Sequence, residues 1–287
     1  MLVASGPNKD TIWGAAMQNT ILSPTEHDER AFFDPLQYAV ASRDADVMHL
    51  VADALGAGRA RLAFQPIMTS DATPRIAFYE GLVRLMDDAG RFLPASHFMP
   101  HVEETALGRQ IDCVTLALAL ERLRQDQALR LSVNLSARSI GDSEWRNILD
   151  RGLASQDDLG ERLIFEISET SAMQLHENVM RFMSAMQPKG IAFALDGFGA
   201  GMIAFRYLKD FLFDLVKIDK SFIKGIDTDP DNQVLTEALI TVAHQFEMFA
   251  IADGVETANE AAFLREIGAD CLQGYHFSVP KLDLSSL

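Results

Sequence analysis

Ile191-Ala192-Phe193-Ala194-Leu195-Asp196-Gly197-Phe198-Gly199-Ala200-Gly201 is a run of five apolar residues that ends on one carboxylate and continues into three glycines. The apolar run predicts a buried strand that ends at Asp196. The glycines predict a loop whose backbone adopts conformations that other residues avoid. A carboxylate delivered by a strand to such a loop can build a phosphate or metal site. Because Asp-Gly is also a common turn, this stretch alone leaves both interpretations open.

The rest of the chain repeats the pattern of an apolar run followed by a helix-like segment. Apolar runs of strand length occur at 62–68, 76–85, 131–135, 163–167, 191–195, 215–218, 248–252 and 271–277. Helical periodicity or capping signals lie mostly between them, at 44–55, 105–125, 143–154, 172–187, 202–209, 230–247 and after Thr257. Asp229-Pro230 and the capping box from Thr257 to Glu260 mark two helix starts.

The order of these elements predicts the fold class. Continuously apolar strands are typical of parallel sheets that are covered on both faces. Eight of them, mostly alternating with helices, predict an α/β fold, a TIM-like (β/α)8 barrel, rather than an open sheet. We expect residues 44–287 to form this barrel domain. Residues 1–43 are weakly patterned, and we expect a short, partly helical N-terminal extension with a regulatory or dimerising role.

Composition limits the partners of the protein. The 287 residues carry a formal net charge of −16, and an acidic surface repels nucleic acid polymers and anionic membranes. A small nucleotide is still compatible, because a metal ion can reverse the field inside a pocket. Cys113 and Cys271 are isolated, which fits a reducing cytoplasm without disulfides. No stretch has the length and apolarity of a membrane span or the pattern of a signal peptide, so we expect a cytoplasmic protein without membrane insertion.

A polar side chain stands at or just past the end of nearly every predicted strand. These residues are Glu80, Asn134, Glu166, Asp196, Lys217 with Asp219, Asp253 and Gln273. In a barrel the carboxyl ends of the strands converge on the face where active sites are built. Carboxylates with an amide oxygen, and without clustered His or Cys, favour Mg²⁺ or Mn²⁺ over Zn²⁺. A buried lysine beside them can stabilise charge on a phosphoryl oxygen. The pattern therefore predicts a metal-dependent phosphoester site.

The motifs that carry these residues resemble the EAL domain, the cyclic-di-GMP phosphodiesterase family. The similar stretches, in order between about 44 and 280, are Phe64-Gln65-Pro66-Ile67, Tyr79-Glu80-Gly81-Leu82-Val83-Arg84, Asn134-Leu135-Ser136, Phe165-Glu166-Ile167-Ser168-Glu169-Thr170, Leu195-Asp196-Gly197-Phe198-Gly199, Val216-Lys217-Ile218-Asp219, Gly254-Val255-Glu256-Thr257 and Gln273-Gly274-Tyr275. The resemblance implies a barrel of the EAL type, cyclic-di-GMP as ligand, a homodimer, and a protein partner in signalling.

The resemblance also implies roles for single residues. It makes Glu80, Asn134, Glu166, Asp196 and Asp253 metal ligands. It gives Lys217, Glu80, Gln273 and Asp253 catalytic positions, and it places Gln65, Pro66, Leu82, Arg84 and Asp219 against the dinucleotide. Arg84 suits a phosphate contact because its planar fork pairs with phosphate oxygens, although a surface ion pair would also explain it. Core packing would equally explain Leu82.

Three departures from the family pattern bear on activity. Gly197 stands where the family has a second Asp that bridges two metal ions, and a glycine supplies no ligand. Asp253 stands where the family has a longer Glu. The loop Gly199-Ala200-Gly201-Met202-Ile203-Ala204 lacks the family's Thr, Tyr and Ser residues, whereas Glu169 matches the residue that holds this loop. The metal complement is therefore predicted to be one Mg²⁺ or Mn²⁺, or none.

These observations leave three hypotheses. The first is a receptor that binds cyclic-di-GMP with lost or very low hydrolysis, because the Gln65, Leu82 and Arg84 side of the site is kept. The second is an active phosphodiesterase that yields the linear dinucleotide. The third is a protein-interaction module without nucleotide binding, which would use Trp13 and the aromatic residues Phe205, Tyr207, Phe211 and Phe213 unless these belong to the core.

Overall fold

The structure is a computed structural model that describes residues 35–201 and 205–284, with side chains described at 44–201 and 207–284. The chain separates into two units, Met1–Arg43 and Asp44–Leu287, and the second is described below by itself. The expectations for residues 1–34, Trp13 included, and for residues 202–204 lie outside the described residues. In the described part of the chain, no helix is long and apolar enough to cross a bilayer.

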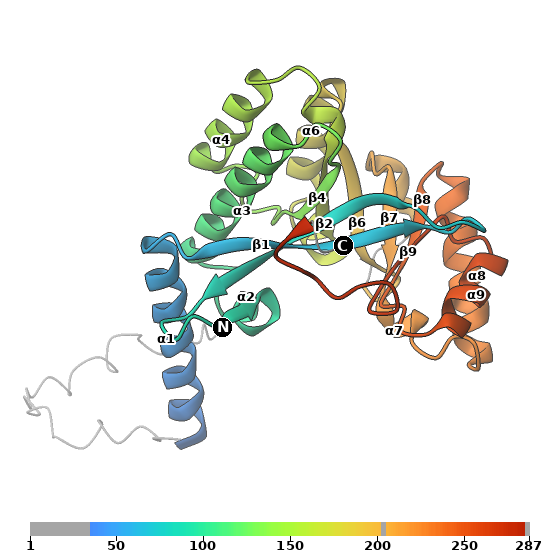
Figure 1. Ribbon diagram of the computed structural model, residues 1–287, viewed down its shortest axis with the longest axis horizontal. Helices are drawn as coiled ribbons and strands as arrows, with labels where there is room; N and C mark the ends of the chain where they lie inside the picture. Colours follow the sequence, from blue (N-terminus) through green and yellow to red (C-terminus); the bar gives the residue numbers. More distant parts are fainter. Residues whose placement is uncertain (1–34, 202–204, 285–287) are drawn as a thin grey trace, which may run out of the picture. The chain divides into compact units, whose positions relative to one another are not determined.

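Helices and strands alternate through most of the second unit (Figure 1). The α-helices are α1 Pro35–Gly56, α2 Met99–Val102, α3 Ala106–Gln125, α4 Ser143–Ala154, α5 Glu169–Gln174, α6 His176–Met186, α7 Lys220–Ile223, α8 Pro230–Gln245 and α9 Ala258–Glu266. The strands are β1 Ala60–Thr69, β2 Ile76–Met86, β3 Phe92–Pro94, β4 Leu131–Asn134, β5 Leu163–Ser168, β6 Ala192–Phe198, β7 Leu215–Ile218, β8 Phe249–Asp253 and β9 Cys271–Gln273. Short 3-10 helices lie at Ala95–His97, Gly160–Arg162, Gln187–Lys189 and Phe205–Asp210.

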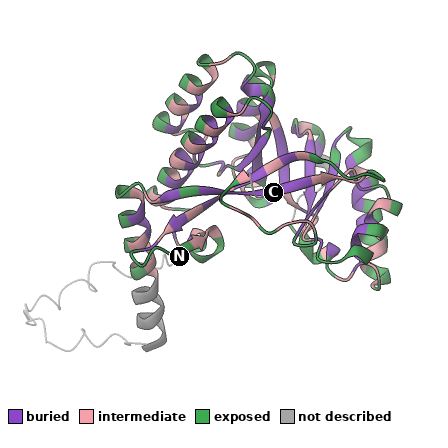
Figure 2. Cartoon of the chain, in the orientation of Figure 1, coloured by how far each residue is buried: buried purple, intermediate pink, exposed green. Residues whose placement is uncertain are grey.

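Eight of these strands form a closed barrel. Their order is β1-β9-β8-β7-β6-β5-β4-β2, and pairing between β1 and β2 closes the ring, while β3 extends β2 as a hairpin. The prediction of an eight-stranded α/β barrel is confirmed. Figure 2 shows that the strands are largely buried, whereas the outer faces of the surrounding helices are exposed. Two helix starts are also confirmed, because Asp229 caps α8 and Thr257 with Glu260 forms a capping box on α9.

The expectation of uniformly parallel strands is wrong for β1. This strand runs antiparallel to both of its neighbours, β2 and β9, whereas the other barrel strands, β2 and β4 to β9, pair in parallel. The physical reason lies in the connection, since only residues 70–75 link β1 to β2. A parallel crossover needs about a dozen residues, but a hairpin needs only a few. The short link therefore fixes the direction of β1.

Three predicted elements differ from those in the structure. The strand predicted at 271–277 stops at Gln273, because Gly274 approaches the backbone of Val255 so closely that a Cβ would lie 2.0 Å from its carbonyl oxygen. The helix predicted at 172–187 is divided at Leu175, which has non-helical angles of φ −125° and ψ 39°. In the segment predicted as a helix at 202–209, the described part forms the 3-10 helix Phe205–Asp210.

Aromatic side chains fill the space between the barrel and its helices on one side. Trp145 of α4 lies 5.5 Å from Phe165 of β5, and Phe182 of α6 lies 6.0 Å from the same ring, measured between ring centroids. Phe211 and Phe213 are also buried in the main core. Their burial agrees with the core alternative and removes them as an exposed interaction surface.

Arg162 connects α3 to the start of β5 from a buried position. Its Nη1 atom donates to the carbonyl oxygens of Leu123, Asp126 and Leu129 at 2.7, 3.0 and 3.4 Å. Replacing Arg162 by alanine should lower the free energy of unfolding by about 2 kcal/mol, because buried acceptors would lose their donor. Urea denaturation measures this change. Arg151→Ala, on the exposed face of α4, is the control and should change it by less than about 0.5 kcal/mol. Equal losses in both variants would contradict the role assigned to Arg162.

Candidate functional site

Side chains that point into the barrel change character along the strands. Toward one end they are apolar and form their own cluster, with Ile67, Phe78, Ile164, Ala194, Leu215 and Ile251 as its buried members. Residues i and i+2 of a strand point to the same face, so the next inward position on each strand is two residues away from the apolar cluster. These positions carry Gln65, Glu80, Asn134, Glu166, Asp196, Lys217, Asp253 and Gln273, which are called the polar layer below.

Lys217 is the centre of the polar layer. Its Nζ atom lies 3.0 Å from Glu80 Oε2 and 2.9 Å from Glu166 Oε2, with Asp196 Oδ1 at 4.0 Å. Lys217, Glu80 and Glu166 are only 3%, 6% and 1% exposed. A buried ion pair adds little net stability, but removing one partner is costly because the other charge is left alone. Loss of any one of these three charged side chains would therefore leave another buried charge unbalanced and destabilise the fold.

Hydrogen bonds tie Glu80 to the segment that follows β9. Asn134 Nδ2 donates to Glu80 Oε1 at 2.9 Å, and Gln273 Nε2 donates to Glu80 Oε2 at 2.7 Å. Gln273 Nε2 also lies 3.3 Å from Gln65 Oε1, and Gln65 Nε2 donates to the carbonyl of Ser278 at 3.1 Å. Amide groups thus orient the Glu80 carboxylate from two sides.

Glu80 lies in the middle of β2 and not at the end of a strand, so that expectation is wrong. The strand continues to Met86 because Arg84–Met86 pair with β3 while the same stretch pairs with the first residues of β1. Its pairing with β4 places Glu80 opposite Ser132. Glu80 therefore belongs to the polar layer, as expected, although its strand continues six residues beyond it.

Burial and charge set the protonation of this group. Burial raises the pKa of Glu166, and the charge of Glu80 raises it further, while Lys217 opposes both. Burial also acts to raise the pKa of Glu80, but the charge of Lys217 and hydrogen bonds from Gln273, Lys217 and Asn134 leave it lowered. Burial acts to lower the pKa of Lys217, yet the two glutamates raise it well above its usual range. Glu80 and Lys217 therefore stay charged at neutral pH.

The end of β6 and the loop after it lie beside this group, and β6 continues to Phe198, so the prediction that this strand ends at Asp196 is wrong. Asp196 is 35% exposed, and the next residue, Gly197, has a φ of 75°. Gly199 also has a positive φ, of 95°, a region that glycine enters at little cost. Glu169 Oε2 accepts from the backbone N–H groups of Gly199 and Gly201 at 3.2 and 3.3 Å. The expected tether between Glu169 and this loop is confirmed.

The residues expected against the dinucleotide flank the polar layer. Pro66 is buried in β1 next to Gln65, and Leu82 lines a cavity beside Asn134. Arg84 is half-buried on the same strand as Leu82, and its Nη1 donates to the carbonyl of Val83 at 3.0 Å. Burial lowers the pKa of Arg84. These positions are compatible with contacts to the dinucleotide, and the contacts themselves stay predictions.

Asp219 and Asp253 differ in their surroundings. Asp219 Oδ1 accepts from the N–H of Ser221 at 2.9 Å and caps α7, so the structure gives this carboxylate a local partner. Asp253 ends β8 opposite Gln273. Burial raises the pKa of Asp253, while Lys217 lowers it. The structure therefore brings Asp253 to the polar layer, and contact of Asp219 with a ligand stays a prediction.

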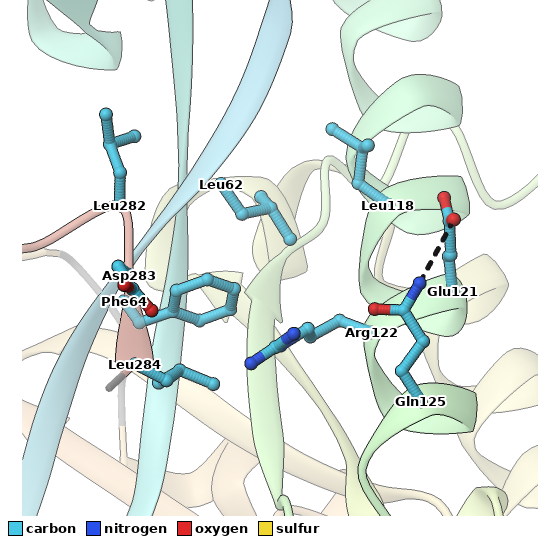
Figure 3. Close-up of a pocket in the computed structure, with 9 residues that line it drawn as sticks. All are labelled: Leu62, Phe64, Leu118, Glu121, Arg122, Gln125, Leu282, Asp283 and Leu284. Atoms are coloured by element: carbon cyan, nitrogen blue, oxygen red, sulfur yellow. Dashed lines mark hydrogen bonds between the residues drawn. The ribbon is translucent and has the colours of Figure 1, made fainter. Parts of the chain in front are cut away.

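Among the cavities in the described part of the chain, two are lined by residues of barrel strands. One, of about 300 Å³, opens beside the polar layer and is lined by Leu82, Asn134 and Glu166, among others. The other, of about 260 Å³, lies between β1, α3 and residues 282–284 (Figure 3). In it, the guanidinium carbon of Arg122 lies 5.9 Å from the ring centre of Phe64. Since no residue of the polar layer lines the second cavity, only the first belongs to the candidate site.

The donor chemistry of the polar layer fits one hard cation. Glu80, Asn134, Glu166 and Asp196 offer carboxylate and amide oxygens, which Mg²⁺ and Mn²⁺ prefer. Oε1 of Gln273 is buried without a partner among the described residues, so one more acceptor faces this region. Within residues 44–201 and 207–284, no group of three or more His, Cys, Asp or Glu side chains is close enough to hold a metal ion. In this arrangement the ammonium group of Lys217 balances Glu80 and Glu166.

Sequence reasoning missed Ser132, Asp112 and Thr115. The Ser132 hydroxyl donates to Glu166 Oε1, and Asp112 and Thr115 are buried residues of α3 that line the cavity of about 300 Å³. A signal existed for Ser132, because it lies two residues before Asn134 and shares its face of β4. The other two lie on the buried stripe of α3, where polar residues are unusual.

Comparison with known proteins identifies the family. The EAL domain model matches residues 50–280. The chain belongs to the EAL domain family. Signaling protein YkoW from Bacillus subtilis is 34% identical over 207 residues, which cover 70% of this chain and 26% of the relative. Cyclic di-GMP phosphodiesterase NbdA from Pseudomonas aeruginosa is 28% identical over 266 residues, which cover 89% of this chain and 33% of the relative.

A solved EAL domain has the same fold. The FimX EAL domain from Pseudomonas aeruginosa, in a crystal structure with bound c-di-GMP, superimposes with a TM-score of 0.75 at 28% identity, covering 83% of this chain and 97% of that one. This EAL chain is therefore related both to a c-di-GMP binder and to phosphodiesterases. It spans about a quarter to a third of the length of the curated relatives it matches.

Proposed function

We propose that this EAL domain is a receptor for cyclic-di-GMP with little or no hydrolysis. Gly197 is the observation that carries the proposal. It follows Asp196 at the mouth of the barrel, where it supplies no oxygen ligand, and its φ of 75° suits a glycine. A site with one carboxylate fewer would hold a second ion poorly, and this would weaken hydrolysis more than binding. The Leu82 and Arg84 side is present for binding, and the c-di-GMP complex of the related FimX domain supports such a ligand.

Any divalent ion in this receptor would be held by Glu80, Asn134, Glu166 and Asp196, with Asp253 in reach of the same layer. When bound, it would supply positive charge to phosphate oxygens. Two positively charged side chains of the protein would act together with such an ion. Lys217 keeps its charge in the buried layer, and Arg84 offers a planar fork of donors to a phosphate group.

A phosphodiesterase is the second candidate. The contacts among Lys217, Glu80, Glu166 and Gln273 favour it, because this arrangement keeps a charged lysine beside ordered carboxylates. A homodimer, a protein partner, a cytoplasmic location and a regulatory role for residues 1–43 belong to the receptor proposal. An interaction module without nucleotide is less favoured, since Phe211 and Phe213 are buried.

Isothermal calorimetry with cyclic-di-GMP tests the proposal. Wild-type protein should bind, and Arg84→Ala should weaken the affinity about 10-fold, because a charged hydrogen bond to phosphate is lost. Arg75→Ala is the matched control. Arg75 is an exposed arginine just before β2, at the end of that strand opposite Arg84, and its replacement should leave the affinity unchanged. Absence of binding by the wild type, with or without Mg²⁺, would refute the receptor.

A further inference from the structure

The inward face of β4 carries a polar residue where the neighbouring strands carry apolar ones. Residues i and i+2 of a strand share a face, so each residue of the polar layer on these strands follows another inward residue two positions earlier. On β5 to β8 these earlier residues are buried apolar members of the cluster next to the polar layer, namely Ile164, Ala194, Leu215 and Ile251. On β4 the same position, two residues before Asn134, is Ser132, which is 0% exposed. A buried hydroxyl in such surroundings costs free energy unless it has a partner, so Ser132 needs a specific explanation.

Glu166, on the adjacent strand β5, supplies that partner. The Ser132 hydroxyl donates to Glu166 Oε1. The carbonyl oxygen of Tyr79 is a second acceptor and lies 3.5 Å from the hydroxyl oxygen. Because a hydroxyl carries a single proton, the closer oxygen of Glu166 takes the hydrogen bond. Ser132 therefore acts on a carboxyl group of the polar layer and not mainly on the backbone.

Both oxygens of the Glu166 carboxyl group have a protein partner. Lys217 Nζ donates to Oε2 at 2.9 Å, and Ser132 donates to Oε1. Lys217 also lies 3.0 Å from Glu80 Oε2 and 4.0 Å from Asp196 Oδ1, so this orientation keeps Glu166 beside two other carboxyl groups. An ionised carboxylate has about four acceptor positions, so each of its oxygens can still accept a cation. Because the Ser132 hydroxyl is neutral, it orients Glu166 without repelling a cation, whereas the ammonium group of Lys217 repels one.

We propose that Ser132 is a positioning residue for the divalent cation of this site, and that its hydroxyl fixes the Glu166 carboxylate in the orientation that binds the ion. This inference rests on the cation site of the proposed function. Hydrogen-bond partners that orient a metal ligand typically change metal affinity by about 10- to 100-fold when they are removed. Without the hydroxyl, Oε1 would lose its donor, and the carboxylate could turn away from Glu80 and Asp196.

Ser139 allows this role to be separated from a purely structural one. Like Ser132, it is 0% exposed, and its hydroxyl donates to a buried carboxyl group, Asp112 Oδ2, at 2.6 Å. Asp112 belongs to α3 and not to the polar layer. Loss of either hydroxyl therefore removes one buried hydrogen bond between a serine and a carboxyl group, but only Ser132 acts on an expected metal ligand.

Calorimetric titration of the full chain with Mn²⁺ alone, at neutral pH and without nucleotide, tests the inference. Ser132→Ala should bind Mn²⁺ about 10-fold more weakly than the wild type, whereas Ser139→Ala should bind it with unchanged affinity. Urea denaturation of the metal-free proteins is the second readout, and both variants should lower the urea midpoint by similar amounts. Ser132→Cys, whose thiol is a weaker donor, should lose less Mn²⁺ affinity than Ser132→Ala, and it provides the comparison with the wild type if the alanine variant does not fold.

Two results would overturn the positioning role while leaving the cation site intact. One is wild-type Mn²⁺ affinity in Ser132→Ala and Ser132→Cys despite a lowered urea midpoint. The other is an equal loss of Mn²⁺ affinity in Ser132→Ala and Ser139→Ala, which would show a general effect of destabilisation. A wild type that does not bind Mn²⁺ would overturn the cation site together with this inference, and binding of cyclic-di-GMP by the same protein would then still support the receptor.

Discussion

Replacing Lys217 by methionine is expected to lower the free energy of unfolding by about 3–5 kcal/mol in metal-free buffer at pH 8. The ammonium group lies within 3.0 Å of both Glu80 and Glu166, which are almost fully buried. Methionine fills a similar volume but leaves two buried carboxyl groups that must either stay ionised without a counter-charge or take up protons at pH 8. Urea denaturation followed by far-UV circular dichroism gives the change. Millimolar Mn²⁺ should restore part of the stability, because a cation would again lie among the carboxylates.

Lys220→Met is the matched control for that variant. Lys220 lies three residues further on, at the exposed start of α7, and its replacement should change the free energy of unfolding by less than about 0.5 kcal/mol. If Lys217→Met were as stable as Lys220→Met, the charge balance described for the polar layer would be wrong.

Gly197→Asp is expected to raise metal-dependent hydrolysis of cyclic-di-GMP on the order of 10²-fold above the wild type, because the missing carboxylate would position the ion and its water again. A Cβ atom at residue 197 meets no other atom within 4 Å, so the side chain has room. The φ of 75° should cost a side-chain-bearing residue about 1 kcal/mol of stability. Initial rates with Mn²⁺, measured by chromatography of the nucleotides, give the comparison.

Gly197→Asn separates the carboxylate from the backbone change. Asparagine tolerates a positive φ at least as well as aspartate, but it brings no charge. The Gly197→Asn variant should therefore lose as much stability as Gly197→Asp but show no increase in the rate of cyclic-di-GMP hydrolysis. A wild type that already hydrolyses cyclic-di-GMP as fast as Gly197→Asp would contradict the importance of this position. A variant that binds but stays inactive would show that Asp253 or the loop at 199–204 is also needed.

Much of the barrel was predictable because its signals are local. Apolar runs and caps such as Thr257 with Glu260 are encoded within a few residues, so the strands from β4 to β8 were placed to within one or two residues. The polar residues Glu166, Asp196 and Lys217 were found for the same reason, since each lies near the end of its own strand. The six-residue link to β2 also indicates that β1 is antiparallel to it. The continuously apolar sequence of β1 nevertheless led to the prediction of a parallel strand.

The remaining errors come from tertiary structure. Glu80 was placed at a strand end although its strand was predicted to reach residue 85, because the chain alone does not reveal that the last residues of β2 pair with β3. Asp112 was not noticed because its environment depends on how α3 packs against the barrel and brings Ser139 to its carboxylate. The break at Leu175 likewise depends on packing, since its neighbours on both sides are helical.

One incubation tests the central claim most directly. The protein is kept overnight with cyclic-di-GMP and Mn²⁺, the protein-bound and free nucleotides are separated by ultrafiltration, and both fractions are analysed by chromatography. A receptor should retain intact cyclic-di-GMP in the protein fraction and yield no linear dinucleotide. Accumulation of the linear dinucleotide by the wild type, absent with Glu80→Ala, would contradict the account and establish a phosphodiesterase that works without a carboxylate at residue 197.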